Sequence, residues 1–159
     1  MVFLLASMCN NFTIHWIGKG RAMTQGKTIE AGARGEASWV VSETDLASRL
    51  AERGGESFPA VFSTARMIAL MELAASRILA PHLEPGQESV GVLVHVTHSA
   101  ATPPGARVTA QATYSGREGK FYAFEVRATD DAGEIGRGIH HRAIVDGRRL
   151  LEGAEKRRR

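Results

Sequence analysis

Residues 62–79 read FSTARMIALMELAASRIL, and this stretch decides the fold of the chain. It is rich in Ala, Leu, Met, Glu and Arg, which favour the helical state, and Ser63 or Thr64 can cap its start. Pro81 then ends it, because proline cannot continue a helix. Apolar side chains cover more than one face of this helix, which is typical of a helix buried on several sides. The sequence therefore predicts a long helix with a sheet wrapped around it.

The other periodic segments alternate as β-strands do. One short strand is predicted before the helix, at residues 36–41. Four more are predicted after it, at residues 90–99, 107–114, 121–129 and 135–145. Glycine, proline and aspartate mark short turns between these four, at residues 103–105, 115–119 and 130–133, which favours an antiparallel meander. The predicted fold class is α+β, with a curved antiparallel five-stranded sheet wrapped around one long central helix.

The 159-residue chain has a net charge of +3, but the charge is divided unevenly. Residues 1–27 hold three basic residues and no acidic one, whereas residues 147–159 hold six basic residues against two acidic ones. The segment between them therefore carries a net charge of −4. Its aromatic residues are not interleaved with basic ones, so nucleic acid is not expected as a partner.

The two ends differ from the body. We expect residues 1–30 to be a poorly ordered or wrongly assigned N-terminal extension, residues 31–147 to form one domain and residues 148–159 to be a basic tail. The start lacks a secretory signal, and no stretch reaches the roughly 18–20 apolar residues of a membrane span. Cys9 is the only cysteine, so no internal disulfide can form. We predict a cytoplasmic protein without a membrane partner.

Glu72 is unusual because apolar residues flank it on both sides. A carboxylate there either turns to solvent or is buried with a partner, since an unpaired buried charge costs several kcal/mol. Thr64 lies two turns earlier on the same side of the helix. His98 ends an apolar row on one face of its strand, after Val92, Val94 and Val96. Each also has a purely structural interpretation: Thr64 as a helix cap, Glu72 as a rim residue and His98 as a packed histidine.

Other kinds of site have weaker support. His140 and His141 point to opposite sides of their predicted strand, so they cannot act as one unit. The sequence has no cysteine pair and no His-x-x-x-His helix, so no metal site is predicted. It also lacks a Gly-x-Ser-x-Gly elbow, a phosphate-binding glycine loop and a dinucleotide fingerprint.

Four segments carry a family resemblance. They are FPAVFST at residues 58–64, leading to LME at 70–72; LEPG at 83–86; VTHSAATPPG at 96–105; and EIGRGIHHR at 134–142. Together they resemble the fluoroacetyl-CoA thioesterase family of the hotdog-fold acyl-CoA thioesterases. The resemblance spans about residues 36–146 and implies a hotdog fold and the hydrolysis of an acyl-CoA thioester.

The resemblance also implies a catalytic group. In that family it consists of a threonine, a glutamate eight residues later on the same helix and a histidine on the following strand, which match Thr64, Glu72 and His98. Glu72 would attack the acyl carbon or activate a water, and both roles stay open. His98 would move the proton, and Thr64 would orient Glu72 or the substrate.

Three further residues match family positions near the acyl group, and we expect them to bind substrate: Phe58 of the lid, Gly91 and Arg142. Gly55 stands where the family has a second lid phenylalanine. A smaller lid packs less apolar surface on the acyl group, so the resemblance predicts the reaction more firmly than the acyl group.

The predicted function is therefore an acyl-CoA thioesterase for a short acetyl- or fluoroacetyl-like chain. No cofactor is expected, because CoA is part of the substrate, and Arg66, Arg107 or Arg137 would suit its phosphates. The resemblance implies a homodimer or higher homo-oligomer with active sites at the subunit boundary. The alternatives are a hotdog acyl-thioester dehydratase and a non-catalytic hotdog protein that binds acyl-CoA or nucleic acid.

Overall fold

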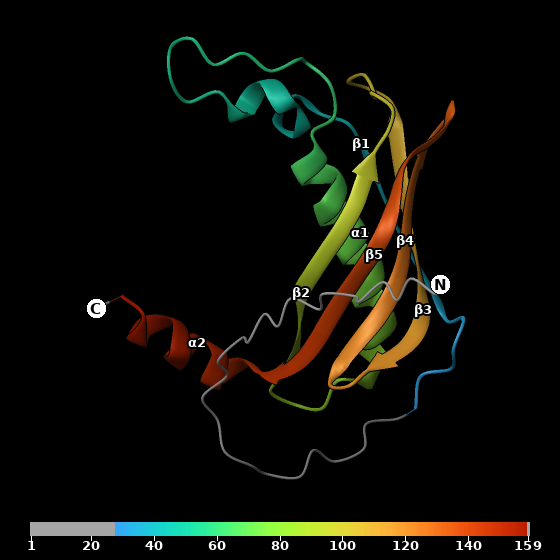
Figure 1. Cartoon of the computed structure of the whole chain (residues 1–159), viewed down its shortest axis with the longest axis vertical. Helices are drawn as coiled ribbons and strands as arrows, with labels where there is room; N and C mark the ends of the chain where they lie inside the picture. Colours follow the sequence, from blue (N-terminus) through green and yellow to red (C-terminus); the bar gives the residue numbers. More distant parts are fainter. Residues whose placement is uncertain (1–27, 159) are drawn as a thin grey trace, which may run out of the picture.

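The computed structural model describes residues 28–158 of the chain (Figure 1). The predictions for residues 1–27, with Cys9, lie outside the described residues. The strands are β1 (Arg34–Val40), β2 (Gln87–His98), β3 (Arg107–Glu118), β4 (Phe121–Asp130) and β5 (Gly133–Asp146). The helices are α1 (Thr64–Leu79) and α2 (Gly147–Lys156), and short 3-10 turns lie at Glu43–Asp45, Ala47–Leu50 and Ala80–His82.

The five strands form one antiparallel sheet in the order β1-β3-β4-β5-β2. The predicted meander is correct for β3, β4 and β5, which are consecutive neighbours. It is wrong for β2, which pairs with β5 at the edge of the sheet and not with β3. The segment after β2 is a crossover and not a hairpin turn, and it is fixed by Thr102, which is buried and donates its hydroxyl to Asp130 at 2.7 Å.

Helix α1 packs along one face of the curved sheet, as Figure 1 shows, so the predicted fold class is confirmed. Ser63 caps its start by accepting a hydrogen bond from the Arg66 backbone N–H at 3.2 Å. Small strand residues let helix and sheet approach closely, since Ala110, Ala112 and Ala128 are fully buried. The buried helix residues are Met67, Leu70, Met71, Ala74, Ala75, Ile78 and Leu79.

Strand β2 contains a bulge that the alternation of its sequence does not predict. Gly91 pairs with Arg142 and Leu93 pairs with the next residue back, His141, so Val92 is an extra residue. The predicted row of even residues therefore breaks at Val92. Val96 packs against the core beneath α1, and beyond it His98 contacts the helix, whereas before the bulge the odd-numbered Gly91 faces the helix.

The segment predicted as a basic tail forms the helix α2. Asp146 caps it by accepting a hydrogen bond from the Arg149 backbone N–H at 2.9 Å. In Figure 1, α2 extends away from the sheet at the end of β5, and most of its residues are exposed. Within residues 28–158, no helix has both the length and the hydropathy needed to cross a membrane.

Candidate active site

The first part of the candidate site lies at the start of α1. Thr64 is the first residue of the helix, and its Oγ1 lies 2.9 Å from Nδ1 of His98, the last residue of β2. The other ring nitrogen of His98, Nε2, is buried and has no hydrogen-bond partner among the described residues. The structure therefore joins two of the three predicted catalytic residues and leaves one buried histidine nitrogen without a hydrogen-bond partner in the described part of the chain.

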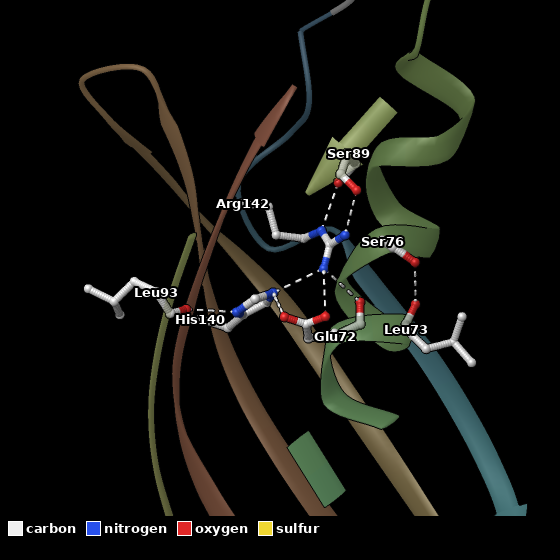
Figure 2. Close-up of polar contacts among 7 residues, drawn as sticks. All are labelled: Glu72, Leu73, Ser76, Ser89, Leu93, His140 and Arg142. Atoms are coloured by element: carbon white, nitrogen blue, oxygen red, sulfur yellow. Dashed lines mark hydrogen bonds and ion pairs between the residues drawn. The ribbon is translucent and has the colours of Figure 1, made fainter. Parts of the chain in front are cut away.

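The second part lies around Glu72, two turns further along α1. Its side chain is 39% exposed, with Oε1 3.9 Å from Nε2 of His140 and Oε2 3.9 Å from Nη1 of Arg142 (Figure 2). Glu72 therefore combines the two states considered for it, since it is partly open to solvent and also lies beside a buried cation. Within residues 28–158, no hydrogen bond or ion pair joins its carboxylate to Thr64 or His98.

The two parts share one side of α1 but are separated along it. Eight residues of helix correspond to about 12 Å of rise. The Glu72 carboxylate of one chain is therefore displaced by about two turns from the Thr64–His98 pair.

Arg142 is held in place by several acceptors. Its Nε donates to Ser89 Oγ and its Nη2 to the Ser89 carbonyl, both at 2.7 Å, while Nη1 donates to the Glu72 carbonyl at 3.3 Å (Figure 2). The residue is 5% exposed, and burial lowers its pKa from the ordinary value, an effect that the nearby Glu72 carboxylate opposes. Arg142 therefore presents a fixed positive charge to Glu72.

His140 also belongs to this cluster, although the sequence predicts no site role for it. Its Nδ1 lies 2.8 Å from the Leu93 carbonyl and its Nε2 lies 3.1 Å from Nη1 of Arg142 (Figure 2). Burial is the main cause that lowers its pKa, Arg142 lowers it further, and the Leu93 carbonyl and Glu72 oppose the shift. The signal that could have found His140 is its spacing, since a residue two before Arg142 on a strand shares its face.

Gly91 allows Glu72 to approach the sheet. A Cβ atom on this residue would overlap Glu72 Oε1 and would lie 3.1 Å from Cε1 of His140. Any larger side chain would therefore push the carboxylate away from β2. This places Gly91 beside the predicted catalytic glutamate.

The loop that contains Phe58 precedes the helix start. Residues 51–60 are all exposed, and Phe58 is 44% exposed. Gly55 has a φ of +95°, a conformation that L side chains rarely adopt. A phenylalanine could not occupy this position without strain, so the backbone of this loop suits the glycine that the chain has there.

A buried carboxylate anchors the base of this loop. Asp45 is 4% exposed and accepts hydrogen bonds from the Ser42 backbone at 2.8 Å, the Ser42 hydroxyl at 2.6 Å and Arg66 Nε at 2.6 Å. Burial alone would raise the pKa of Asp45, but the hydrogen bonds from Ser42 and Arg66 outweigh it and hold the pKa below its ordinary value. The Arg66 guanidinium also stacks over Trp39, with 4.3 Å to the ring centroid.

These contacts bear on the arginines considered for CoA. Arg66 is bound by Asp45, and Arg137 lies 2.7 Å from Glu134, whereas Arg107 is exposed. Within residues 28–158, no group of three or more His, Cys, Asp or Glu side chains is arranged to hold a metal ion.

Comparison with known proteins places this arrangement in a family. A family model described as fluoroacetyl-CoA-specific thioesterase matches residues 41–148. A fluoroacetyl-CoA thioesterase from Streptantibioticus cattleyicolor is 49% identical over 88 residues, which cover 55% of this chain and 63% of that protein. The match thus spans less than two thirds of the length of that relative.

Solved structures give a longer match. A fluoroacetyl-CoA thioesterase is 37% identical with a TM-score of 0.76, over 81% of this chain and 97% of the other. Variants of that enzyme have been solved with fluoroacetate and CoA and with acetyl-CoA. A thioesterase superfamily member from Thermus thermophilus is 28% identical with a TM-score of 0.74, over 83% of this chain and 95% of the other.

Proposed function

Because the chain belongs to the fluoroacetyl-CoA-specific thioesterase family, we propose that it hydrolyses a short-chain acyl-CoA, of the acetyl or fluoroacetyl type, to the free acid and CoA. The observation that carries the proposal is a half-exposed carboxylate, Glu72, beside the buried cation Arg142, on the same side of α1 as the Thr64–His98 pair. Acyl transfer needs such a set: a base or nucleophile, a proton carrier and fixed positive charge.

In the proposed reaction, the thioester carbon is attacked by the Glu72 carboxylate or by a water that Glu72 deprotonates. The C–S bond then breaks, and the CoA thiolate takes a proton from His98, which then regains one from the attacking water, by way of Glu72 where Glu72 acts as the base. If Glu72 attacks, water hydrolyses the resulting acyl anhydride and restores the carboxylate. Either route consumes one water, and CoA enters only as part of the substrate. Backbone N–H groups at the start of α1 would stabilise the oxyanion.

The Thr64–His98 pair suits the proton transfer. Since Thr64 Oγ1 engages Nδ1 at 2.9 Å, the buried Nε2 of His98 is left without a partner within the described chain, and it is the ring nitrogen proposed to transfer the proton. The Thr64 hydroxyl would fix the orientation of the His98 ring, because proton transfer needs the two groups to be aligned as well as close together.

Two chains would complete the site. We infer a homodimer in which β2 pairs with β2 of a second copy, because β2 is a 12-residue edge strand and carries exposed Leu93 and Val94, with exposed Ile139 beside it on β5. Such pairing would bring Glu72 of one copy toward the Thr64–His98 pair of the other. A site shared between two copies would overcome the two-turn separation of these residues within one chain.

A mixing experiment tests the shared site. Glu72→Gln and His98→Asn each inactivate one half, so each variant alone is inactive. If the halves come from different copies, refolding an equal mixture restores about one quarter of wild-type turnover, since half of the dimers form with one intact site each. If both halves come from one chain, the mixture stays inactive, and the shared-site proposal is wrong.

A direct assay tests the activity itself. We expect the protein to release free thiol from acetyl-CoA and fluoroacetyl-CoA, and E72Q to lower kcat by at least about 10³-fold while its far-UV circular dichroism stays unchanged. Glu118→Gln is a matched control, because this exposed carboxylate pairs with His141 and not with the Glu72 cluster. Undiminished turnover by E72Q, or hydration of an enoyl-CoA without thiol release, would contradict the proposal.

A further inference from the structure

His140 has a hydrogen-bond partner for each of its two ring nitrogens. It forms a cluster with Glu72 and Arg142, called the Glu72 cluster. It is 1% exposed and lies on β5 opposite Val94 of β2, with Leu93 O on one side and Arg142 on the other (Figure 2). A buried polar ring with both nitrogens engaged has one orientation and one tautomer available to it.

The two partners select a single tautomer. A carbonyl oxygen can only accept, so Nδ1 carries the proton that it donates to Leu93 O at 2.8 Å. In a neutral ring Nε2 is then an acceptor, and the atom that faces it at 3.1 Å is Nη1 of Arg142, which can only donate. The contacts are therefore complementary when His140 is neutral with its proton on Nδ1.

This acceptor accounts for the orientation of the Arg142 guanidinium. Two nitrogens of Arg142, Nε and Nη2, donate hydrogen bonds to Ser89. The third, Nη1, donates to the Glu72 carbonyl at 3.3 Å and to His140. The same Nη1 is 3.9 Å from Glu72 Oε2. His140 thus holds the Arg142 nitrogen that lies 3.9 Å from the proposed catalytic carboxylate.

We propose that His140 is a positioning residue that, as a neutral Nδ1–H tautomer, holds Arg142 through its Nε2 acceptor and so fixes the charge that orients Glu72. This rests on the proposed function, because it assigns His140 a part in the same thioester hydrolysis. His140 itself does not transfer the proton in this proposal, since its Nε2 lone pair is directed at Arg142.

Protonation would reverse these contacts. An Nε2–H would point at the Arg142 cation, which only donates, and would compete with it for the Glu72 carboxylate 3.9 Å away. The other ionisable neighbour, His141, points to the opposite face of β5 and lies 3.8 Å from Glu118. Burial and the adjacent cation both lower the pKa of His140, in agreement with a neutral ring.

Two variants separate the two ring nitrogens. In His140→Asn the amide can donate from the Nδ1 position to Leu93 but offers nothing to Arg142. In His140→Gln the carbonyl can accept from Arg142 at the Nε2 position but cannot donate to Leu93 in the same way. We expect H140N to lower kcat by about tenfold or more with KM within about threefold, and H140Q to recover most of that loss.

His141→Asn is the matched control, because it alters the neighbouring buried histidine on the other face of the strand, and we expect its kcat to equal that of the wild type. Each variant is compared at equal folded fraction, measured by thermal melting. Equal losses in H140N and H140Q, or wild-type kcat in H140N, overturn the proposal.

An experiment without substrate distinguishes this proposal from the function on which it rests. In ¹⁵N-histidine-labelled protein at neutral pH, we expect His140 to show a protonated Nδ1 and an unprotonated Nε2. A protonated Nε2 overturns the proposal even if the protein hydrolyses acyl-CoA. The expected tautomer together with no acyl-CoA hydrolysis would overturn the function and the catalytic part of the proposal, while the Arg142 contact would stand.

Discussion

Substitution of Gly91 by alanine is the perturbation that examines the Glu72 cluster most directly. The added Cβ would overlap Glu72 Oε1 and would approach both Glu72 Cδ and His140 Cε1 to 3.1 Å, whereas ordinary contacts are 3.4–4 Å. The His140 ring is buried and cannot retreat, but the Glu72 side chain is 39% exposed and flexible at its end. The carboxylate therefore moves by about 1 Å or more, and the fold stays intact.

This displacement predicts a loss of activity without a matching loss of stability. A misplacement of about 1 Å can cost about 10²-fold in rate, equivalent to about 2.7 kcal/mol of barrier. The free energy of unfolding should fall by less than about 1 kcal/mol, which lowers the Tm of a chain of this size by less than about 4 °C. A loss of kcat that is much larger than the loss of stability indicates that the substitution displaces the Glu72 carboxylate and leaves the fold intact.

The assay is thiol release from acetyl-CoA, with thermal melting of the same samples. Gly153→Ala serves as the control, because no atom lies within 4 Å of its added Cβ, and its kcat should equal that of the wild type. A double-mutant cycle with Glu72→Ala locates the effect: if Gly91→Ala acts through Glu72, the double variant is no slower than E72A. A further 10²-fold loss in the double variant, or wild-type kcat in the single one, would refute this reasoning.

Three further predictions follow from other contacts. Thr64→Val removes the hydroxyl that engages His98, so kcat should fall about tenfold or more while Tm changes little, and Thr64→Ser should restore turnover; an inactive T64S would contradict this. Asp45→Asn weakens the bond to Arg66, and differential scanning calorimetry should show a loss of about 1–2 kcal/mol, or about 2–8 °C in Tm. The pKa of His140 is lower in the folded state than its ordinary 6.5, so the unfolded chain binds more protons and stability should fall as pH drops below about 6.5. Urea unfolding at several pH values checks this, because H140Q should show a smaller decline than the wild type over the same window.

The central helix and the strand order after it were partly predictable. Local signals bounded α1 within two residues, because the Ser63 cap and Pro81 act over a single turn. The pairing of β2 with β5 was not predictable in this way, since it depends on contacts between distant segments. Gly116 illustrates a second limit. The sequence predicts a turn at residues 115–119, but β3 continues to Glu118, and this glycine, with a φ of +135°, lies at an irregularity in the pairing.

The family resemblance predicts Thr64, Glu72, His98 and Arg142 as site residues, but the sequence does not predict His140, which contacts Arg142 and lies beside Glu72. Thr64 and His98 come together because the start of α1 meets the end of β2. The sequence predicts no role for His140, because its neighbouring histidine faces the other way and periodicity cannot show what lies across the sheet. Only the folded chain shows that a helix carboxylate and a strand arginine converge on this ring.

The bulge in β2 connects these two parts of the site. On a regular strand, residues seven apart point to opposite faces, so Gly91 and His98 could not both face α1. The extra residue at Val92 changes the parity, and both then face the helix: Gly91 makes room for Glu72, and His98 reaches Thr64. The bulge therefore lets one edge strand serve both the carboxylate cluster and the threonine–histidine pair. No local pattern in the valine-rich sequence marks Val92 as the extra residue. Alternation alone therefore predicts which side chains face α1 only for the part of β2 that follows the bulge.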